Sequence, residues 1–433
     1  MNTFRQARAG DVGGDGLQLM EGNTSAVEPI IRKAIAEESN RRMVALIFLN
    51  VTRQDLGPDT KAITDEELVA GIITAYKTEE QTLKQLKPRY DKVVPEAQEA
   101  LRFAAAEYGV AAPDFSRFQL SYGFWHYLTF SMADCLAQGK PLAYMTTSLS
   151  CRGQYSPPTD LALVRLDEKP ESETNQPWNV RKVYIHEGLH QMGHEIRDAG
   201  GQVVVKGIGR SGVRHNYDRG LLEEGLISIL AKQHDARYTP PSTTDTYPKE
   251  VALITWMTQA GISMSTFTKA HFNGETTALE RRIDDVFGDG LISFLTGMRS
   301  GEEPSGRMGY DPFIRQLPTA QPCEVRAFMR IIQGRPLEAL ASSPEVSDQR
   351  LEGLLASYYR YLYLEAVPLN RPRQDRVELD AALYRLPDSL AQKIRSIPGE
   401  GWSLYKGDAK EEAEKAFQQA AREAIKRAKE RKE

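Results

Sequence analysis

The sequence predicts an α+β fold that is mostly helical, with a small sheet over one central helix and helical regions on either side. Apolar residues recur at helical spacing through most of the chain. Two short stretches, residues 159–167 and 202–206, instead favour strands. Between them lie two histidines, His186 and His190, spaced one helical turn apart. These three observations set the fold class and point to the region where the function resides.

Length and composition exclude several classes of protein. At 433 residues and 41% hydrophobic content, the chain can bury a large core in two or three domains. A net charge of -4 argues against a nucleic-acid-binding protein. The three cysteines, Cys135, Cys151 and Cys323, are too few and too scattered for a disulfide framework or a cysteine zinc cluster. Because we find neither a signal-peptide pattern nor an apolar stretch of spanning length, we expect a cytoplasmic protein that does not bind membranes.

Composition and periodicity divide the chain into five regions. The boundary near residue 300 follows from a stretch rich in glycine and proline, residues 299–312. In order, the regions are a flexible N-terminus (1–25), a mainly helical region (26–155), a catalytic domain (156–300), a helical C-terminal region (301–405) and a charged terminal helix (406–433).

The N-terminal region contains no catalytic motif and is expected to be a helical scaffold. Helices are predicted from Ala26 to Leu49, from Asp65 to Tyr76 and from Pro95 to Tyr108. The aromatic stretch that follows, residues 115–150, favours either strands or a buried helix over residues 127–138, and His126 within it is expected to be a core residue. Residues 153–158 predict a turn.

The central helix contains the sequence His186-Glu187-Gly188-Leu189-His190, which has the pattern H-E-x-x-H. On a helix the two histidine backbones are about 6 Å apart along the axis, so both imidazoles can reach one ion. Zinc binds imidazole nitrogen readily and keeps an open position when it is catalytic. Glu187 lies beside the pair, where it can take a proton from a water molecule. Asn179 is predicted to cap this helix, and Gly200 with Gly201 to end it.

A catalytic zinc needs a third protein ligand, and the sequence offers several. His194 is unsuitable, because on a straight helix it lies about 12 Å from His186, whereas two nitrogens on one zinc lie within about 4 Å of each other. It is expected to be structural or to face the substrate. Better candidates are Glu223 and Glu224, which interrupt an apolar helical run over residues 220–230. Carboxylates rarely remain on apolar faces unless they are paired or bound to a metal.

An H-E-x-x-H helix followed by a helix with a glutamate resembles the gluzincin group of zinc metallopeptidases, over roughly residues 159–290. The resemblance implies a zincin-like catalytic core. It also implies one Zn²⁺ held by His186, His190 and Glu224, with Glu187 as general base. A peptide or protein substrate would then add as a further strand beside the strand at residues 159–167.

Residues that stabilise the developing oxyanion are sought near the glutamate helix. The loop 207–219 enters that helix directly, so His215 or Tyr217 could donate a hydrogen bond there, although both could equally be ordinary loop residues. Tyr247 is a further candidate. Asp218 could cap the helix or compete as the third ligand.

The remaining chain is predicted to be helical. The predicted helices cover residues 247–257, 262–272, 279–287, 323–333, 336–341 and 351–364. His234 and His271 are not expected to be ligands. The terminal helix starts at Asp408, which with Glu411 resembles a capping box, and its thin apolar face predicts a solvated or frayed helix or, alternatively, a partner-binding tail.

These features together predict a zinc-dependent metallopeptidase. Two alternatives remain from the sequence. One is a binding or scaffold protein that keeps the fold without catalysis, and the other is a metal-dependent hydrolase of a non-peptide amide or ester.

Overall fold

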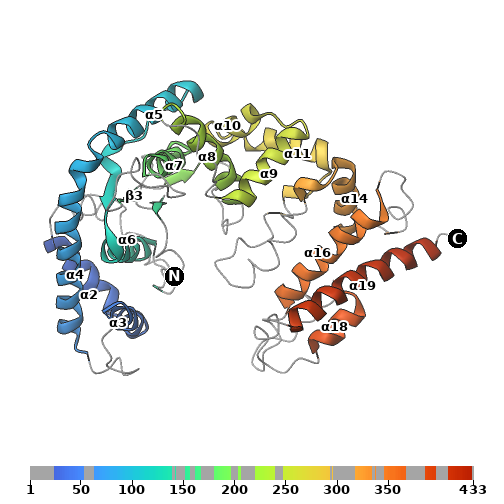
Figure 1. The fold of residues 1–433 in the computed structure, drawn as a ribbon, viewed down its shortest axis with the longest axis horizontal. Coiled ribbons are helices and arrows are strands. Elements are labelled where there is room, and N and C mark those ends of the chain that lie inside the picture. The colour runs from blue at the N-terminus through green and yellow to red at the C-terminus, as the bar shows by residue number, and fades with distance from the viewer. Residues whose placement is uncertain are drawn as a thin grey trace, which may run out of the picture. The chain divides into compact units, whose positions relative to one another are not determined.

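The fold is mostly helical with two small sheets, which confirms the predicted α+β class (Figure 1). The computed structural model describes residues 24–52, 63–138, 142, 152–156, 161–166, 180–196, 203–205, 220–238, 247–292, 295, 317–333, 337, 346–366, 386–395 and 408–431. The predicted flexible N-terminus lies outside these ranges, except that Thr24 and Ser25 begin the first helix. No helix in the described ranges is long and apolar enough to cross a membrane.

The chain forms two compact units. The first contains residues 1–206 and 227–246, and the second contains residues 207–226 and 247–433. The helix α8 (Gly220–Asp235) runs without interruption through the division at residues 226 and 227.

Within the described ranges, the first unit begins with five helices. They are α2 (Thr24–Ile35), α3 (Glu38–Thr52), α4 (Asp65–Leu86), α5 (Val93–Tyr108) and α6 (Gly123–Gln138). The core of α2, α4 and α6 includes Ile31, Leu68, Tyr76 and Leu128, all fully buried. Most predicted helices of this region are therefore confirmed. The aromatic stretch forms both a strand and a helix, rather than one of the two.

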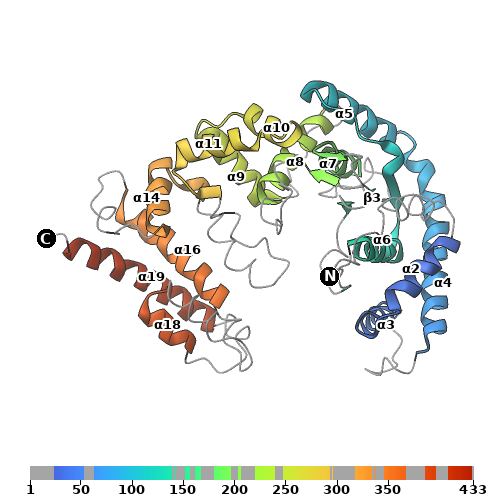
Figure 2. The ribbon, with the colours of Figure 1, turned by 180° about the vertical axis from the view of Figure 1, so that it is seen from behind.

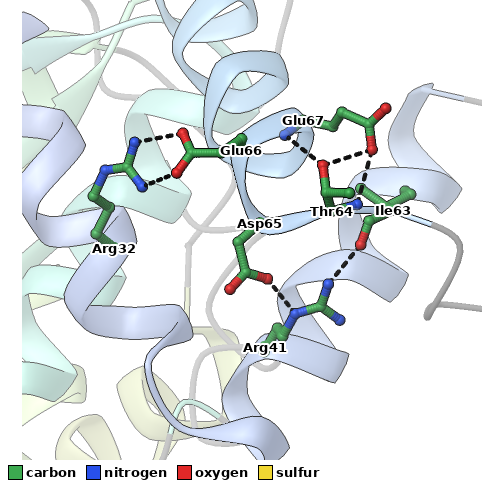
Figure 3. Close-up of polar contacts among 7 residues, drawn as sticks. All are labelled: Arg32, Arg41, Ile63, Thr64, Asp65, Glu66 and Glu67. Atoms are coloured by element: carbon green, nitrogen blue, oxygen red, sulfur yellow. Dashed lines mark hydrogen bonds and ion pairs between the residues drawn. The ribbon is translucent and has the colours of Figure 1, made fainter.

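Helix α4 starts at a capping box, which Figure 3 shows. The Thr64 hydroxyl accepts a hydrogen bond from Glu67 N–H at 3.2 Å, and the Glu67 carboxylate accepts one from Thr64 N–H at 2.8 Å. Arg32 of α2 pairs with both carboxylate oxygens of Glu66, and Arg41 of α3 pairs with Asp65 (Figure 3). The first turn of α4 is thus tied to both preceding helices.

The larger sheet has the strand order β1-β3-β2. Strand β3 (Leu161–Arg165) pairs in parallel with β1 (Phe118–Ser121) and antiparallel with β2 (Gly153–Ser156). Two predictions are corrected here. Residues 153–156 form a strand instead of part of a turn, and the strand predicted at 159–167 is central, so both of its edges are already paired and no peptide can add to it.

The central helix α7 (Val180–Met192) ends earlier than predicted. Gly193 N–H bonds to Leu189 O at 3.3 Å and to His190 O at 3.1 Å, which tightens the last turn and closes the helix. Strand β4 (His194–Ile196) follows and pairs antiparallel with β5 (Val203–Val205), the strand predicted at 202–206. The predicted cap Asn179 and the predicted helix end at Gly200 and Gly201 lie outside the described residues.

The second unit is helical in all its longer described elements. Its helices are α9 (Pro248–Gln259), α10 (Met264–Phe272), α11 (Thr276–Phe287), α14 (Pro322–Ile332), α16 (Asp348–Ala366), α18 (Asp388–Arg395) and α19 (Asp408–Glu430). These confirm the predicted helices of this region, apart from residues 336–341, which are outside the described ranges except for Leu337. The predicted boundary at 299–312 also lies outside them.

The terminal helix α19 is neither solvated nor frayed, which corrects the prediction. It packs along α16 (Figures 1 and 2). Phe417 is fully buried, and alanines at 413, 420, 421 and 428 widen the buried face. Ion pairs between Lys429 and Asp348 and between Arg422 and Glu352 align the two helices antiparallel.

Candidate metal centre

Helix α7 is buried almost throughout. All of its residues except Val183 are buried, including His186 at 8% exposure, Glu187 at 6% and His190 at 8%. It packs against α5, β2 and β3. Ionisable side chains on a buried helix need a specific partner or ion, because desolvation without one is costly.

The two histidines point their Nε2 atoms toward each other. Their Nε2 atoms are 3.2 Å apart, and their ring centroids are 4.8 Å apart with an angle of 72° between the planes. Two imidazole nitrogens bound tetrahedrally at about 2.0–2.1 Å from zinc are separated by about 3.3 Å. The separation therefore fits two ligands of one tetrahedral ion with little movement of either side chain.

Glu224 of α8 completes the group. One ligand atom from each of His186, His190 and Glu224 lies within 4.8 Å of the other two. Among the described residues, this is the one set of three His, Cys, Asp or Glu side chains with the spacing of a metal site. Two imidazoles and one carboxylate are a donor set that catalytic zinc uses. Of the two adjacent acids, it is Glu224 rather than Glu223 that lies with the histidines.

Glu187 is held on the sheet side of α7. A β-carbon added to Gly153 of β2 would come within 2.6 Å of Glu187 Oε1 and 2.6 Å of Val183 Cγ1. The strand backbone thus passes close to the carboxylate, and a side chain at residue 153 would force Glu187 and Val183 to shift. Glu187 therefore lies between His186 and His190 in the sequence, and its side chain lies against the edge strand β2.

Two further glycines mark close helix crossings around the motif. A β-carbon at Gly188 would lie 2.4 Å from Leu101 Cδ1 of α5. A β-carbon at Gly225, next to Glu224, would lie 2.3 Å from the carbonyl oxygen of Glu250 in α9. At Gly225 the obstacle is backbone, so that position requires glycine, whereas at Gly188 an added carbon would force the Leu101 side chain to shift.

The C-terminal half of α8 is fastened within the first unit. Tyr108 Oη lies 2.9 Å from His234 Nε2, and burial lowers the pKa of His234. Arg181 of α7 donates to Asp235 at 2.7 Å and to Glu96 of α5 at 2.5 Å. His234 thus contacts a tyrosine and belongs to no metal group of the described residues.

Some of the other residues considered in the sequence analysis lie within the described ranges and some lie outside them. Tyr247 is half-buried and precedes the first turn of α9. His194 starts β4, beyond the end of α7. His215, Tyr217 and Asp218 lie outside the described residues. His126 is fully buried, and its ring centre lies 4.4 Å from that of Tyr76 with the two planes tilted by 54°, as expected for a core histidine.

Two residues at the site were missed by the sequence analysis, Gly153 and Arg181. Gly153 was assigned to a turn, and nothing in its local sequence indicates a strand against Glu187. Arg181 lies beside Val180 and Val183 at the start of the motif helix, and a charged residue that is buried with such neighbours needs a partner.

Comparisons of the chain with protein-family profiles, with curated proteins and with solved structures found no match. The geometry of the site itself is therefore the basis for any functional conclusion.

Proposed function

We propose that this protein is a zinc-dependent metallopeptidase. The observation that supports this most directly is the convergence of two histidine Nε2 atoms, 3.2 Å apart, with the Glu224 carboxylate. A purely structural histidine pair would not need a buried carboxylate at Glu187 in the same turn.

His186, His190 and Glu224 would hold the ion. A bound zinc would supply Lewis-acid chemistry, by polarising a carbonyl group and making a water molecule more acidic. Three protein ligands rather than four are typical of catalytic zinc sites, which keep a further position open for water or substrate.

Glu187 acts as the general base. Its carboxylate accepts a proton from the attacking water and later donates that proton to the leaving amine. The neighbouring Gly153 backbone keeps the carboxylate from swinging toward the sheet, since the two groups are in contact. Glu187 is 6% exposed, so few bulk water molecules compete for its lone pairs.

The edge strand β2 supports a peptide as the substrate. Arg165 N–H bonds to Arg152 O at 2.9 Å, which makes this residue pair a hydrogen-bonded pair of the β2–β3 ladder. Bonded and non-bonded pairs alternate in an antiparallel ladder, so the backbone groups of Gly153 face away from β3. An extended peptide pairing with that edge would lie beside Glu187.

The test uses the full-length protein. Purified wild type should contain about one zinc per chain and cleave members of a mixed peptide library, as read by mass spectrometry. Glu187→Gln, which preserves size and polarity, should retain the zinc and lose cleavage by at least about 100-fold. Absence of zinc after reconstitution would refute the proposal. Zinc without peptide cleavage would favour a scaffold protein or a hydrolase of another amide or ester.

A further inference from the structure

We propose that Arg181 is a positioning residue for the metal ligand Glu224, acting through the C-terminal half of α8. This inference rests on the proposed zinc site. Arg181 itself is in the first turn of α7, on the same helix as the two histidines. It does not belong to the ligand group, and its side chain is directed to the far end of α8.

Arg181 links three helices through buried contacts. Its Nε donates to Asp235 Oδ1 of α8 at 2.7 Å, and its Nη1 donates to Glu96 Oε2 of α5 at 2.5 Å. The side chains of Arg181 and Asp235 are each 5% exposed. The guanidinium also lies 5.2 Å from the centre of the Tyr238 ring, which follows α8. A planar guanidinium can hold two carboxylates in fixed directions at once, as a lysine cannot.

The rest of the C-terminal end of α8 is attached to α5. Tyr238 Oη donates to Glu99 at 3.1 Å, and Tyr108 Oη lies 2.9 Å from His234 Nε2. Arg237 lies 4.7 Å from the centre of the Phe103 ring. These contacts attach α8 to α5, whereas Arg181 joins this end of α8 directly to the histidine helix.

The geometry of a helix makes this attachment important for the metal. The stretch of α8 between Glu224 and Asp235 spans about 16 Å, so a tilt of about 10° at Asp235 displaces Glu224 by about 3 Å. Zinc–ligand distances vary by only about 0.2 Å in well-formed sites. Loosening the Arg181 contacts would therefore withdraw the carboxylate, while leaving both histidines in place on α7.

The experiment is a double-mutant cycle on zinc affinity, measured in the full chain by competition with a chromophoric chelator. Four proteins are compared: wild type, Arg181→Met, Glu224→Gln and the double variant. We expect Arg181→Met to weaken zinc binding by about 10- to 100-fold, the range seen for residues that orient metal ligands. The double variant should bind zinc no more weakly than Glu224→Gln alone, because both changes remove the same ligand.

A spectroscopic signature separates positioning from general destabilisation. With Co²⁺ in place of zinc, the visible absorption of Arg181→Met should match that of Glu224→Gln rather than wild type. Arg360→Met is the matched control, because Arg360 forms a similar partly buried pair with Glu414 between α16 and α19. Its zinc affinity and Co²⁺ spectrum should equal those of wild type.

The outcomes are distinct. Fold-losses that multiply in the double variant, or a wild-type Co²⁺ spectrum in Arg181→Met, would overturn the positioning role and leave the zinc site intact. Failure of wild type to bind zinc would overturn both proposals. If Arg181→Met does not fold, Arg181→Lys takes its place in the cycle, since it keeps the charge but cannot bridge both carboxylates.

Discussion

Gly153 and Glu187 are in direct contact: the position of a β-carbon on Gly153 lies 2.6 Å from Glu187 Oε1. A strand residue and the proposed general base thus pack against each other, although they are far apart in the sequence. Any side chain at residue 153 must displace the carboxylate or move the strand.

Gly153→Ala should therefore reduce catalysis without removing zinc. We expect kcat for peptide cleavage to fall by about 10- to 100-fold, part of the usual contribution of a general base. Zinc affinity should stay within about twofold of wild type. Gly109→Ala is the control, because its β-carbon would meet nothing within 4 Å and only its φ of 68° is unfavourable. Unchanged kcat in Gly153→Ala would show that Glu187 does not act from this position.

Gly188→Ala tests the crossing of α5 and α7. Alanine favours a helix over glycine by about 1 kcal/mol, but the added carbon would lie 2.4 Å from Leu101 Cδ1. Overpacking costs about 1–3 kcal/mol, so the net effect should be a loss of stability. Adding Leu101→Ala removes the clash, and urea unfolding should show that the two losses do not add. Additive losses would argue against this contact.

Glu79, which is partly buried, and His126, whose backbone N–H donates to it, predict an unusual pH dependence of stability. Burial raises the pKa of Glu79 to about 7, and burial lowers the pKa of His126 to about 4. Glu79 binds its proton more tightly in the folded chain, so its contribution to stability falls as the pH rises from about 4.5 to 7. His126 has the opposite effect: as the pH falls from about 6.5 to 4, His126 is protonated in the unfolded chain but not in the folded chain, so stability falls.

The variant Glu79→Gln should show the pH dependence of stability that His126 causes, without the opposing contribution of Glu79. Trp125 N–H donates to Glu79 Oε1 at 3.0 Å and His126 N–H donates to Oε2 at 2.8 Å, so the glutamine oxygen can keep one of these two hydrogen bonds at any pH. Relative to wild type, the free energy of unfolding of Glu79→Gln should rise by up to about 3 kcal/mol between pH 4.5 and 7. Urea unfolding across that range measures the difference. A constant difference would contradict the raised pKa of Glu79.

The packing of α19 predicts a contrast between two substitutions. Phe417 is fully buried beside the Tyr363 ring at 5.2 Å, so Phe417→Ala should cost about 3–5 kcal/mol. Arg422 is 64% exposed in its pair with Glu352, so Arg422→Ala should cost less than about 1 kcal/mol. Thermal unfolding and trypsin digestion of the full chain would distinguish them. Equal, negligible losses would mean that α19 does not pack on α16.

The histidine pair could be predicted from sequence because helical spacing is local. Four residues along a helix always return to the same face, so His186 and His190 meet wherever the helix lies. The choice of Glu224 over Glu223 could not be derived in this way. Both acids interrupt apolar faces of α8, and only the rotation of that helix within the folded chain decides which carboxylate reaches the histidines.

Other errors arose where distant or weak contacts decide the structure. Strand β2 depends on pairing with β3, and its own residues, beginning with Gly153, suggest a turn. Helix α7 ends at Met192 because β4 begins at His194 and pairs with β5, whereas the sequence offered a stronger stop at Gly200. The apolar face of α19 is wider than its large apolar residues suggest, because several of its alanines are also buried.

The path of the chain has a consequence for dissecting this protein into fragments. Residues 227–246 complete the first unit after the chain has left it at residue 206, so no single cut yields both units as continuous polypeptides. A fragment ending at residue 206 would lack Asp235, and Arg181 would lose one of its two carboxylate partners. Circular permutants or co-expressed pieces, rather than simple truncations, are therefore the appropriate way to isolate the histidine helix.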